Sequence, residues 1–301
     1  MFASFFILKK LTSKAVVSDS YFSIFHLNVQ SIRNKVDEVE VVLHNIEESY
    51  DVLCFTEHWL TNYELDLLKL GSFKIASAYT RKDKGYGGVV ILVNDKIKYQ
   101  VIDVSKFCNV IDIELAAIKV NKPKLIIITV YRAPKGNLEV LYSNLTNLFN
   151  FINIIDSDVI INGDFNIHFD RKTKQTLEFL NFLKSYNLRP LIFENTRANS
   201  CIDNILTNIA HDCRHQVMET HLSDHRAATV EILYNRHKSK DCSKVVSYQP
   251  FTEVGFFNFF NIISDCNFDF INDAGLDTNT KFNLFTKLIS DKVNMAFPIK
   301  V

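Results

Sequence analysis

Apolar, strand-like segments that end on a polar side chain recur along this 301-residue chain, and this recurrence limits what it can fold into. The segments are FSIFHLNV, YDVLCFTEH, DVIINGDFN and ETHLSDHRAATVEI. The polar residues that they carry are Asn28, Glu57, Asp164 with Asn166, and Asp224 with His225. Carboxylate, amide and imidazole groups bind divalent cations and phosphate oxygens. The pattern therefore predicts one site for metal-assisted phosphoester hydrolysis, built from several strand ends.

The composition is that of a folded chain with no overall charge. It is 47% hydrophobic and 23% charged, which permits one large domain, or one domain with an appendage. The 34 Lys and Arg residues balance 34 Asp and Glu residues, so any DNA binding must come from local patches. The six cysteines lie far apart without a C-x-x-C pair, which favours reduced thiols in an intracellular compartment.

Residues 1–20 read as an N-terminal extension. Their lysines follow the short apolar run instead of preceding it, and no A-x-A-like site closes the run, so we expect no signal peptide. No apolar segment approaches the length of a membrane span, and we therefore expect no membrane association.

Hydrophobic periodicity predicts an α/β fold across residues 21–236. The expected helices cover residues 33–49, 138–155 and 172–187. The expected strands cover residues 22–29, 50–58, 73–80, 87–95, 112–120, 124–134, 158–166, 190–193, 200–208 and 227–235. Helices come singly and hairpins are mixed with helical connections, which indicates a layered α/β sandwich with mixed sheets.

The chain changes character near residue 237. RHKSKDCSKVVSYQP is polar and has no periodicity, so it reads as a linker, and two phenylalanine-rich helices are expected at 251–272 and 280–298. We assign 237–301 to a linker and a C-terminal helical segment. These helices either pack back on the domain or lead into a further domain.

The polar residues have suitable chemistry for phosphodiester hydrolysis. Asn28, Glu57 and Asp224 offer the oxygen ligands that Mg²⁺ prefers, with Mn²⁺ as an alternative. Asp164 can orient or deprotonate water, and Asn166 can hydrogen-bond the same water or the phosphate. His225 can donate to the phosphate or act as the base, and Asp203 in SCIDNILTN is the expected partner that orients it.

Other candidates point to structural roles. His211, Cys213 and His215 do not have the spacing of a common zinc site and are expected in a polar loop. Ser200 has no G-x-S-x-G motif around it, so a serine nucleophile is not supported. Arg132 is expected to contact solvent or the DNA backbone. The glycines of RKDKGYGG supply turn freedom in a hairpin and lack a nucleotide-loop pattern.

The motifs LNVQS, TEHWL, VYRAP, NGDFN, SCIDNILTN and SDH, in that order, resemble the endonuclease/exonuclease/phosphatase superfamily, which includes apurinic endonucleases and pancreatic-type DNase. LNVQSIRNK, CFTEHWL, R-x-x-x-G-Y-G-G-V, YRAP and IDNILTN bring the resemblance closer to the endonuclease domain of non-LTR (LINE-type) retrotransposons. The resemblance covers residues 21 to 235.

The resemblance implies a four-layer, DNase I-like α/β sandwich of two mixed β-sheets flanked by helices. It implies that the strand ends form one cleft with a metal site and a catalytic set. The implied metal ligands are Asn28, Glu57 and Asp224, and the implied catalytic residues are Tyr131, Asp164, Asn166, Asp203 and His225. Tyr131 would hydrogen-bond the phosphate, and which of Asp164 and His225 is the base stays open.

The function expected from these motifs is a Mg²⁺-dependent DNA endonuclease that nicks one strand to leave a 3′-hydroxyl for reverse transcription, in an intracellular and nuclear setting. A phosphatase or phosphodiesterase for a small molecule or lipid headgroup is one alternative. The other alternative is a non-catalytic nucleic-acid-binding protein. It is disfavoured because no member of the catalytic set is missing. The sequence does not indicate the oligomeric state.

Overall fold

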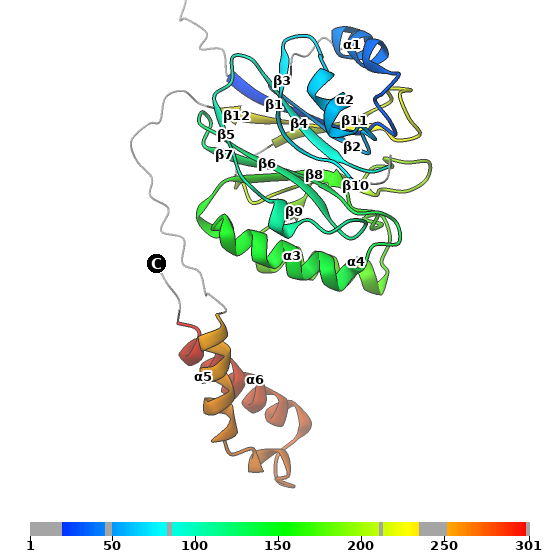
Figure 1. Ribbon diagram of the computed structural model, residues 1–301. Helices are drawn as coiled ribbons and strands as arrows, with labels where there is room; N and C mark the ends of the chain where they lie inside the picture. The colour runs from blue at the N-terminus through cyan, green and yellow to red at the C-terminus, as the bar shows by residue number, and fades with distance from the viewer. Residues whose placement is uncertain (1–19, 46–49, 83–85, 211–212, 235–251, 299–301) are drawn as a thin grey trace, which may run out of the picture. The chain divides into compact units, whose positions relative to one another are not determined.

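The computed structural model describes residues 20–45, 50–82, 86–210, 213–234 and 252–298. The chain divides into two compact units, residues 1–236 and 237–301. In the first unit, two six-stranded mixed sheets pack face to face and helices cover their outer faces (Figure 1). The predicted fold class, a four-layer α/β sandwich, is confirmed.

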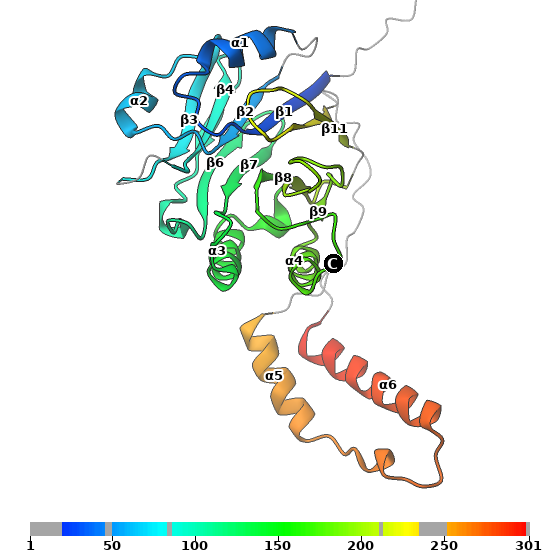
Figure 2. The same ribbon diagram turned by 90° about the vertical axis from the view of Figure 1, so that its right-hand side faces the viewer.

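The first sheet has the strand order β11-β12-β1-β2-β4-β3. Its strands are β1 (Ser20–Asn28), β2 (Val52–Thr56), β3 (Phe73–Tyr79), β4 (Val89–Asn94), β11 (Cys213–Met218) and β12 (Ala227–Tyr234). Only β1 and β2 are parallel, and the other pairs are antiparallel. Helices α1 (Val36–Asn45) and α2 (Asn62–Leu67) lie on the outer side of this sheet, as Figure 2 shows.

The second sheet has the strand order β5-β6-β7-β8-β10-β9. Its strands are β5 (Tyr99–Val101), β6 (Glu114–Val120), β7 (Leu125–Tyr131), β8 (Val159–Asp164), β9 (Arg189–Pro190) and β10 (Asp203–Thr207). Here β7 and β8 form the parallel pair. Helices α3 (Leu138–Phe151) and α4 (Lys174–Ser185) cover its outer face (Figure 2), and the short turns η1 (Ser105–Phe107) and η2 (Ile154–Asp156) complete the unit.

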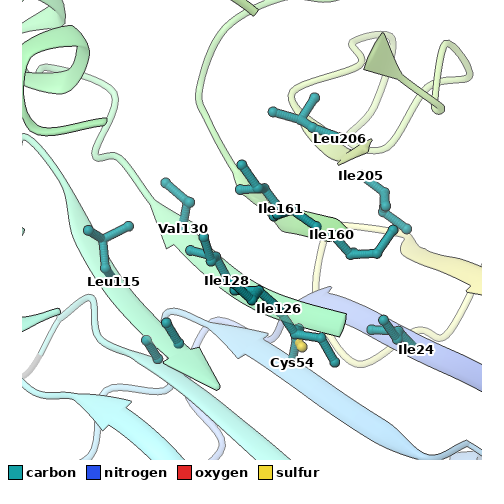
Figure 3. Close-up of a cluster of buried hydrophobic side chains, with 14 of the residues drawn as sticks. Ile24, Cys54, Leu115, Ile126, Ile128, Val130, Ile160, Ile161, Ile205 and Leu206 are labelled. Atoms are coloured by element: carbon teal, nitrogen blue, oxygen red, sulfur yellow. The ribbon is translucent and has the colours of Figure 1, made fainter. Parts of the chain in front are cut away.

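The core lies between and around the sheets and is rich in β-branched side chains. All seven residues of β7, LIIITVY, are buried, as expected of a central strand covered on both faces. Figure 3 shows Ile126, Ile128 and Val130 of β7 near Ile160 of β8, with Cys54 of the first sheet nearby. β-branched side chains pack well on a pleated surface, which explains why these runs form strands instead of buried helices.

The parallel pairs bring the predicted polar residues to one edge of the sandwich. Asn28, the last residue of β1, is in register with Thr56, the last residue of β2. In the second sheet, Tyr131 at the end of β7 is in register with Asp164 at the end of β8. Asp203, the first residue of the antiparallel strand β10, lies opposite Asp164 on its other side. Strand pairing therefore gathers two strand ends in the first sheet and three in the second, and the packing of the two sheets brings the groups together.

Two predicted elements were wrong. Cys213 and His215, expected in a polar loop, belong to β11, an edge strand whose middle residues are exposed and therefore tolerate polar side chains. The strand expected at 190–193 is reduced to β9, Arg189–Pro190. The Asn204 side chain binds both the N–H and the carbonyl of Ile192, so these groups are not available to a β-ladder. His211 lies outside the described residues.

The second unit contains the two predicted phenylalanine-rich helices. They are α5 (Glu253–Ser264) and α6 (Thr278–Ala296), with the short turn η3 (Asp269–Ile271) between them. Thr252 and Asp277 cap their N-termini by accepting backbone N–H bonds. Phe257, Phe260 and Phe282 remain exposed. The predicted N-terminal extension lies outside the described residues except for Ser20, the first residue of β1. The predicted linker, RHKSKDCSKVVSYQP, also lies outside them. No helix among the described ranges is long and apolar enough to cross a membrane.

Gly163 allows β7 and β8 to approach each other just before Asp164. Its φ is +155°, and a Cβ atom at this position would collide with the backbone carbonyl of Val130 on β7. A side chain here must push apart two paired strands at the base of the site, because a packed backbone has no room to yield.

We expect Gly163→Ala to lower the free energy of unfolding by about 2–4 kcal/mol, because overpacking displaces the β7–β8 pair. Gly71→Ala is the matched control, since Gly71 also has positive φ but has open space around its Cβ position. The control should cost about 1–2 kcal/mol. Urea denaturation followed by circular dichroism measures both, and equal losses in the two variants would contradict the close-approach explanation.

Candidate active site

The Asn28 side chain connects the two sheets at the predicted site. Its amide nitrogen donates one hydrogen bond of 2.9 Å to Glu57 Oε1 and a second of 2.9 Å to Asp164 Oδ2. Its amide oxygen accepts a 3.2 Å bond from the backbone N–H of Gln30. Both protons of one fully buried amide are thus shared between a carboxylate of the first sheet and a carboxylate of the second.

Asp164 is buried at the end of β8 and accepts two hydrogen bonds. One comes from Asn28, and the other is the 2.9 Å bond from the backbone N–H of Asn166 to Asp164 Oδ1. Burial, followed by the nearby Asp203 carboxylate, raises the pKa of the Asp164 carboxyl above its usual range. The side chain of Asn166 donates to the carbonyl of Arg132 at 2.7 Å, so this amide also fixes the loop after β8.

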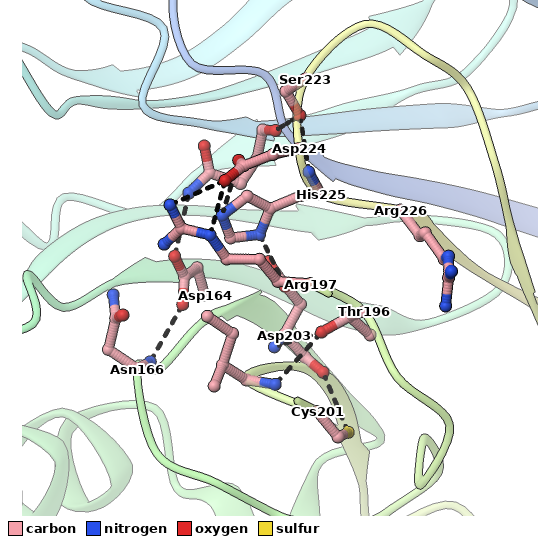
Figure 4. Close-up of polar contacts among 12 residues, drawn as sticks. Asp164, Asn166, Thr196, Arg197, Cys201, Asp203, Ser223, Asp224, His225 and Arg226 are labelled. Atoms are coloured by element: carbon pink, nitrogen blue, oxygen red, sulfur yellow. Dashed lines mark hydrogen bonds and ion pairs between the residues drawn. The ribbon is translucent and has the colours of Figure 1, made fainter. Parts of the chain in front are cut away.

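Asp203 and His225 form a buried hydrogen-bonded pair beside Asp164 (Figure 4). His225 Nδ1 lies 2.8 Å from Asp203 Oδ2. Burial lowers the pKa of His225, but the Asp203 carboxylate outweighs it, and the net shift is upward. The hydroxyl of Thr196 accepts the backbone N–H of Asp203 at 3.0 Å, which holds the start of β10. Within the described residues, His225 Nε2 and Asp203 Oδ1 have no hydrogen-bond partner.

Asp224 lies next to this pair, but its carboxylate faces the guanidinium of Arg197. Its Oδ2 accepts bonds from Arg197 Nε at 2.9 Å and Nη2 at 2.8 Å, as Figure 4 shows. Its Oδ1 is 3.8 Å from His225 Nε2. The side chain of Asp224 is 54% exposed. Asp224 is therefore near the other predicted residues, and its predicted role as a metal ligand stays a prediction.

Tyr131 is buried at the end of β7, between acidic and basic groups. Burial, together with the carboxylates of Glu57 and Asp164, raises the pKa of its hydroxyl. The Arg81 guanidinium lies 5.8 Å from the centre of the Tyr131 ring, within the range of a cation–π contact. Arg81 is held in turn by a 2.5 Å ion pair with the buried carboxylate of Glu114.

Arg132 is buried, whereas the sequence had suggested a contact with solvent or the DNA backbone. Its residue is only 2% exposed, and its guanidinium donates to the carbonyls of Phe165 at 2.8 Å, Gly136 at 2.6 Å and Asn166 at 2.7 Å. Three buried carbonyls need donors, and a planar guanidinium supplies them in fixed directions. Arg132 thus holds the loop that carries Asn166.

A groove of about 620 Å³ runs beside Asn166. Its lining includes the basic side chains of Lys135, His168 and Arg197. A neutral chain that binds a polyanion needs such a local basic surface. This groove adjoins the site through Asn166 and Arg197.

Within the described residues, one cluster of two carboxylates and an imidazole has the spacing of a metal site. Ligand atoms of Asp164, Asp203 and His225 all lie within 4.8 Å of one another, and all three residues are buried. Glu57 reaches the same region through Asn28. The unpartnered Asp203 Oδ1 and the hard oxygen donors fit a divalent cation such as Mg²⁺.

The structure thus brings together seven of the eight predicted site residues through hydrogen bonds, strand register or close approach, and it places Asp224 at the rim. Sequence reasoning missed Arg81 and Arg197 as contributors, whereas Thr196 had been considered as a residue that shapes the cleft. Arg81 and Arg197 lie in the polar segments RKDKGYG and ENTRANS, where a charged residue is normally solvated. Only their distant partners Glu114 and Asp224 distinguish them.

Comparison with known proteins shows the family of the chain. The model of the "Endonuclease/Exonuclease/phosphatase family" matches residues 25–225. No curated protein matches the chain at a significant level.

Three solved structures share the fold at low sequence identity. The endonuclease domain of TRAS1, a telomere-specific non-LTR retrotransposon, has a TM-score of 0.58 and 13% identity, covering 71% of this chain and 99% of that domain. The Xenopus laevis APE2 catalytic domain has a TM-score of 0.53 and 16% identity, covering 69% and 91%. The 3′ phosphatase NExo from Neisseria, bound to a product DNA hairpin, has a TM-score of 0.52 and 17% identity, covering 71% and 99%.

We expect Asp203→Asn to lower the pKa of His225, because the amide removes the charge that opposes desolvation of the imidazolium. Imidazole nitrogen shifts measured by NMR against pH, in the presence of EDTA, report this pKa. Asp224→Asn is the control, since Asp224 is exposed and 3.8 Å away, and it should change the pKa less. A larger effect from the control would contradict the assigned pairing.

Proposed function

This chain belongs to the endonuclease/exonuclease/phosphatase family, and on that premise we propose that it is a Mg²⁺-dependent DNA endonuclease that nicks one strand and leaves a 3′-hydroxyl. One observation carries the proposal. Asn28 joins the carboxylates of Glu57 and Asp164 across the two sheets, directly beside the Asp203–His225 pair. This arrangement supports a site in which acidic ligands, a proton acceptor and a proton donor surround one point.

The residues can divide the work of hydrolysis. His225, held by Asp203 with its pKa raised, carries a proton that its free Nε2 can donate to a phosphate oxygen. Asp164, fixed by Asn28 and Asn166, has the raised pKa expected of a carboxylate that accepts a proton from water. We therefore propose Asp164 as the base and His225 as the donor.

The donor set suits a hard divalent cation. The predicted ligands Glu57 and Asp224 would supply carboxylate oxygens. Asn28 would supply an amide oxygen only after its amide turns over, because its Nδ2 now faces both Glu57 and Asp164 and its Oδ1 accepts from Gln30. When bound, the cation supplies charge stabilisation for the pentavalent phosphate and the departing oxygen. Asp224 would have to leave Arg197 to take part, and a phosphate oxygen is a suitable replacement partner for this arginine.

DNA is the substrate that the surroundings favour. The groove lined by Lys135, His168 and Arg197 adjoins the catalytic residues and suits an extended phosphate backbone. The fold shared with the TRAS1 endonuclease domain supports a role in non-LTR retrotransposition, in which the new 3′-hydroxyl would prime reverse transcription. Such a role would place the protein in the nucleus.

The test is nicking of a supercoiled plasmid in the presence of Mg²⁺. We expect EDTA to abolish nicking, and Asp164→Ala and His225→Ala each to reduce its rate by about a hundredfold or more, because each removes a proton-transfer group. Lys174→Ala is the control, since Lys174 lies 91% exposed on α4, and it should retain the wild-type rate.

Retention of nicking in both site variants would contradict the assignment of Asp164 and His225. A wild-type chain that leaves plasmid intact but hydrolyses an inositol phosphate would instead make it a phosphatase of the same family. Inositol phosphate release is measured in parallel with the same preparations, so the two substrates are compared directly.

A further inference from the structure

The chain contains a single tryptophan, Trp59, and it contacts Glu57 directly. The indole Nε1–H donates a 3.0 Å hydrogen bond to Glu57 Oε2. The other oxygen, Oε1, accepts the 2.9 Å bond from Asn28. Each carboxylate oxygen therefore has a fixed donor, and the orientation of the carboxylate is set from both sides.

The backbone of this segment is strained in a way that favours this contact. Glu57 and Trp59 have φ values of +54° and +57°, in the left-handed region that bulky side chains rarely occupy. Such strain costs on the order of 1–3 kcal/mol per residue and persists only where the surroundings enforce it. With both residues in this conformation, the indole of Trp59 reaches back to the carboxylate of Glu57.

The surroundings enforce this conformation through His58. One ring nitrogen accepts the backbone N–H of Leu60 at 3.0 Å, and the other lies 3.0 Å from the carbonyl of Tyr79. A side chain on Gly88 would collide with the His58 ring, so this neighbouring backbone also confines it. His58, between Glu57 and Trp59, is thus held by the end of β3 and by Gly88, just before β4.

Trp59 itself is clamped at three further points. Its backbone N–H donates to the carbonyl of Gly87 at 3.0 Å, and its carbonyl accepts a 2.9 Å bond from Arg33. Its ring packs edge to face on Tyr86, with ring centres 4.9 Å apart. Tyr86 is 65% exposed, so the aromatic pair lies at the surface and contributes little to the core. These contacts fix the indole without making it a structural core residue.

We propose that Trp59 is a positioning residue that holds Glu57 in its cation-binding orientation. The inference rests on the proposed function, in which Glu57 binds the divalent cation. Hydrogen bonds to the ligands of a metal site set their orientation, and losing one costs about ten- to a hundredfold in metal affinity. The indole N–H performs this task for Oε2, as the Asn28 amide does for Oε1.

The matched variant is Trp59→Phe, which keeps an aromatic ring against Tyr86 and removes the N–H donor. Tyr86→Leu is the control, because it removes the ring contact and leaves the hydrogen bond to Glu57. We expect Mn²⁺ to bind Trp59→Phe about ten- to a hundredfold more weakly than wild type and to bind Tyr86→Leu within about twofold of wild type. Electron paramagnetic resonance of free Mn²⁺, titrated into the full chain, measures this affinity.

A second measurement keeps Trp59 in place and therefore tests the proposal even if Trp59→Phe does not fold. The single indole N–H gives one tryptophan side-chain signal in a ¹H–¹⁵N NMR spectrum. We expect Glu57→Gln to move this signal in the metal-free protein, and Mg²⁺ to move it in wild type but not in Glu57→Gln.

The outcomes separate the two proposals. If wild type binds Mn²⁺ and nicks plasmid while Trp59→Phe binds Mn²⁺ equally well, the positioning role is wrong and the proposed function stands. If the indole signal does not respond to Glu57→Gln, the contact is absent in solution and the inference is likewise overturned. If wild type binds no Mn²⁺ and Mg²⁺ leaves the signal unchanged, both proposals fail.

Discussion

The site depends on one amide group that serves two sheets. Asn28 has two N–H protons, and it donates one to Glu57 in its own sheet and the other to Asp164 in the opposite sheet. Two carboxylates that converge without a cation would repel each other, and a buried donor between them offsets that repulsion. The packing of the sandwich must therefore bring the ends of β1, β2 and β8 to within the reach of a single asparagine.

Much of this arrangement could be predicted from the sequence because the strand ends are local signals. Asn28, Glu57 and Asp164 each close an apolar run, and parallel strands in a covered sheet align their carboxyl ends. The pairing of Asp203 with His225 was also anticipated, and their atoms lie 2.8 Å apart. The metal and catalytic roles of the individual residues remain predictions, since roles depend on bound substrate and cation.

The sequence could not reveal contacts between residues that lie far apart in the chain and belong to no recognisable motif. Arg132 looked like a surface cation because nothing near it in sequence shows that three carbonyls converge on it. Arg197 sits in a polar loop, and only folding brings it to Asp224, 27 residues later. The edge strand β11 lacks a clear apolar alternation because its middle residues, Arg214, His215 and Gln216, are exposed.

The close approach at Gly163 gives a criterion for judging related sequences. The motif NGDFN is short, and its glycine reports on the spacing between the β7 and β8 backbones, which the carboxylate of Asp164 does not. A homologous chain that keeps both carboxylates and places any side chain at this position cannot seat β8 beside β7 in the same way. Such a chain would keep its catalytic residues and still hold Asp164 at a different position relative to β7.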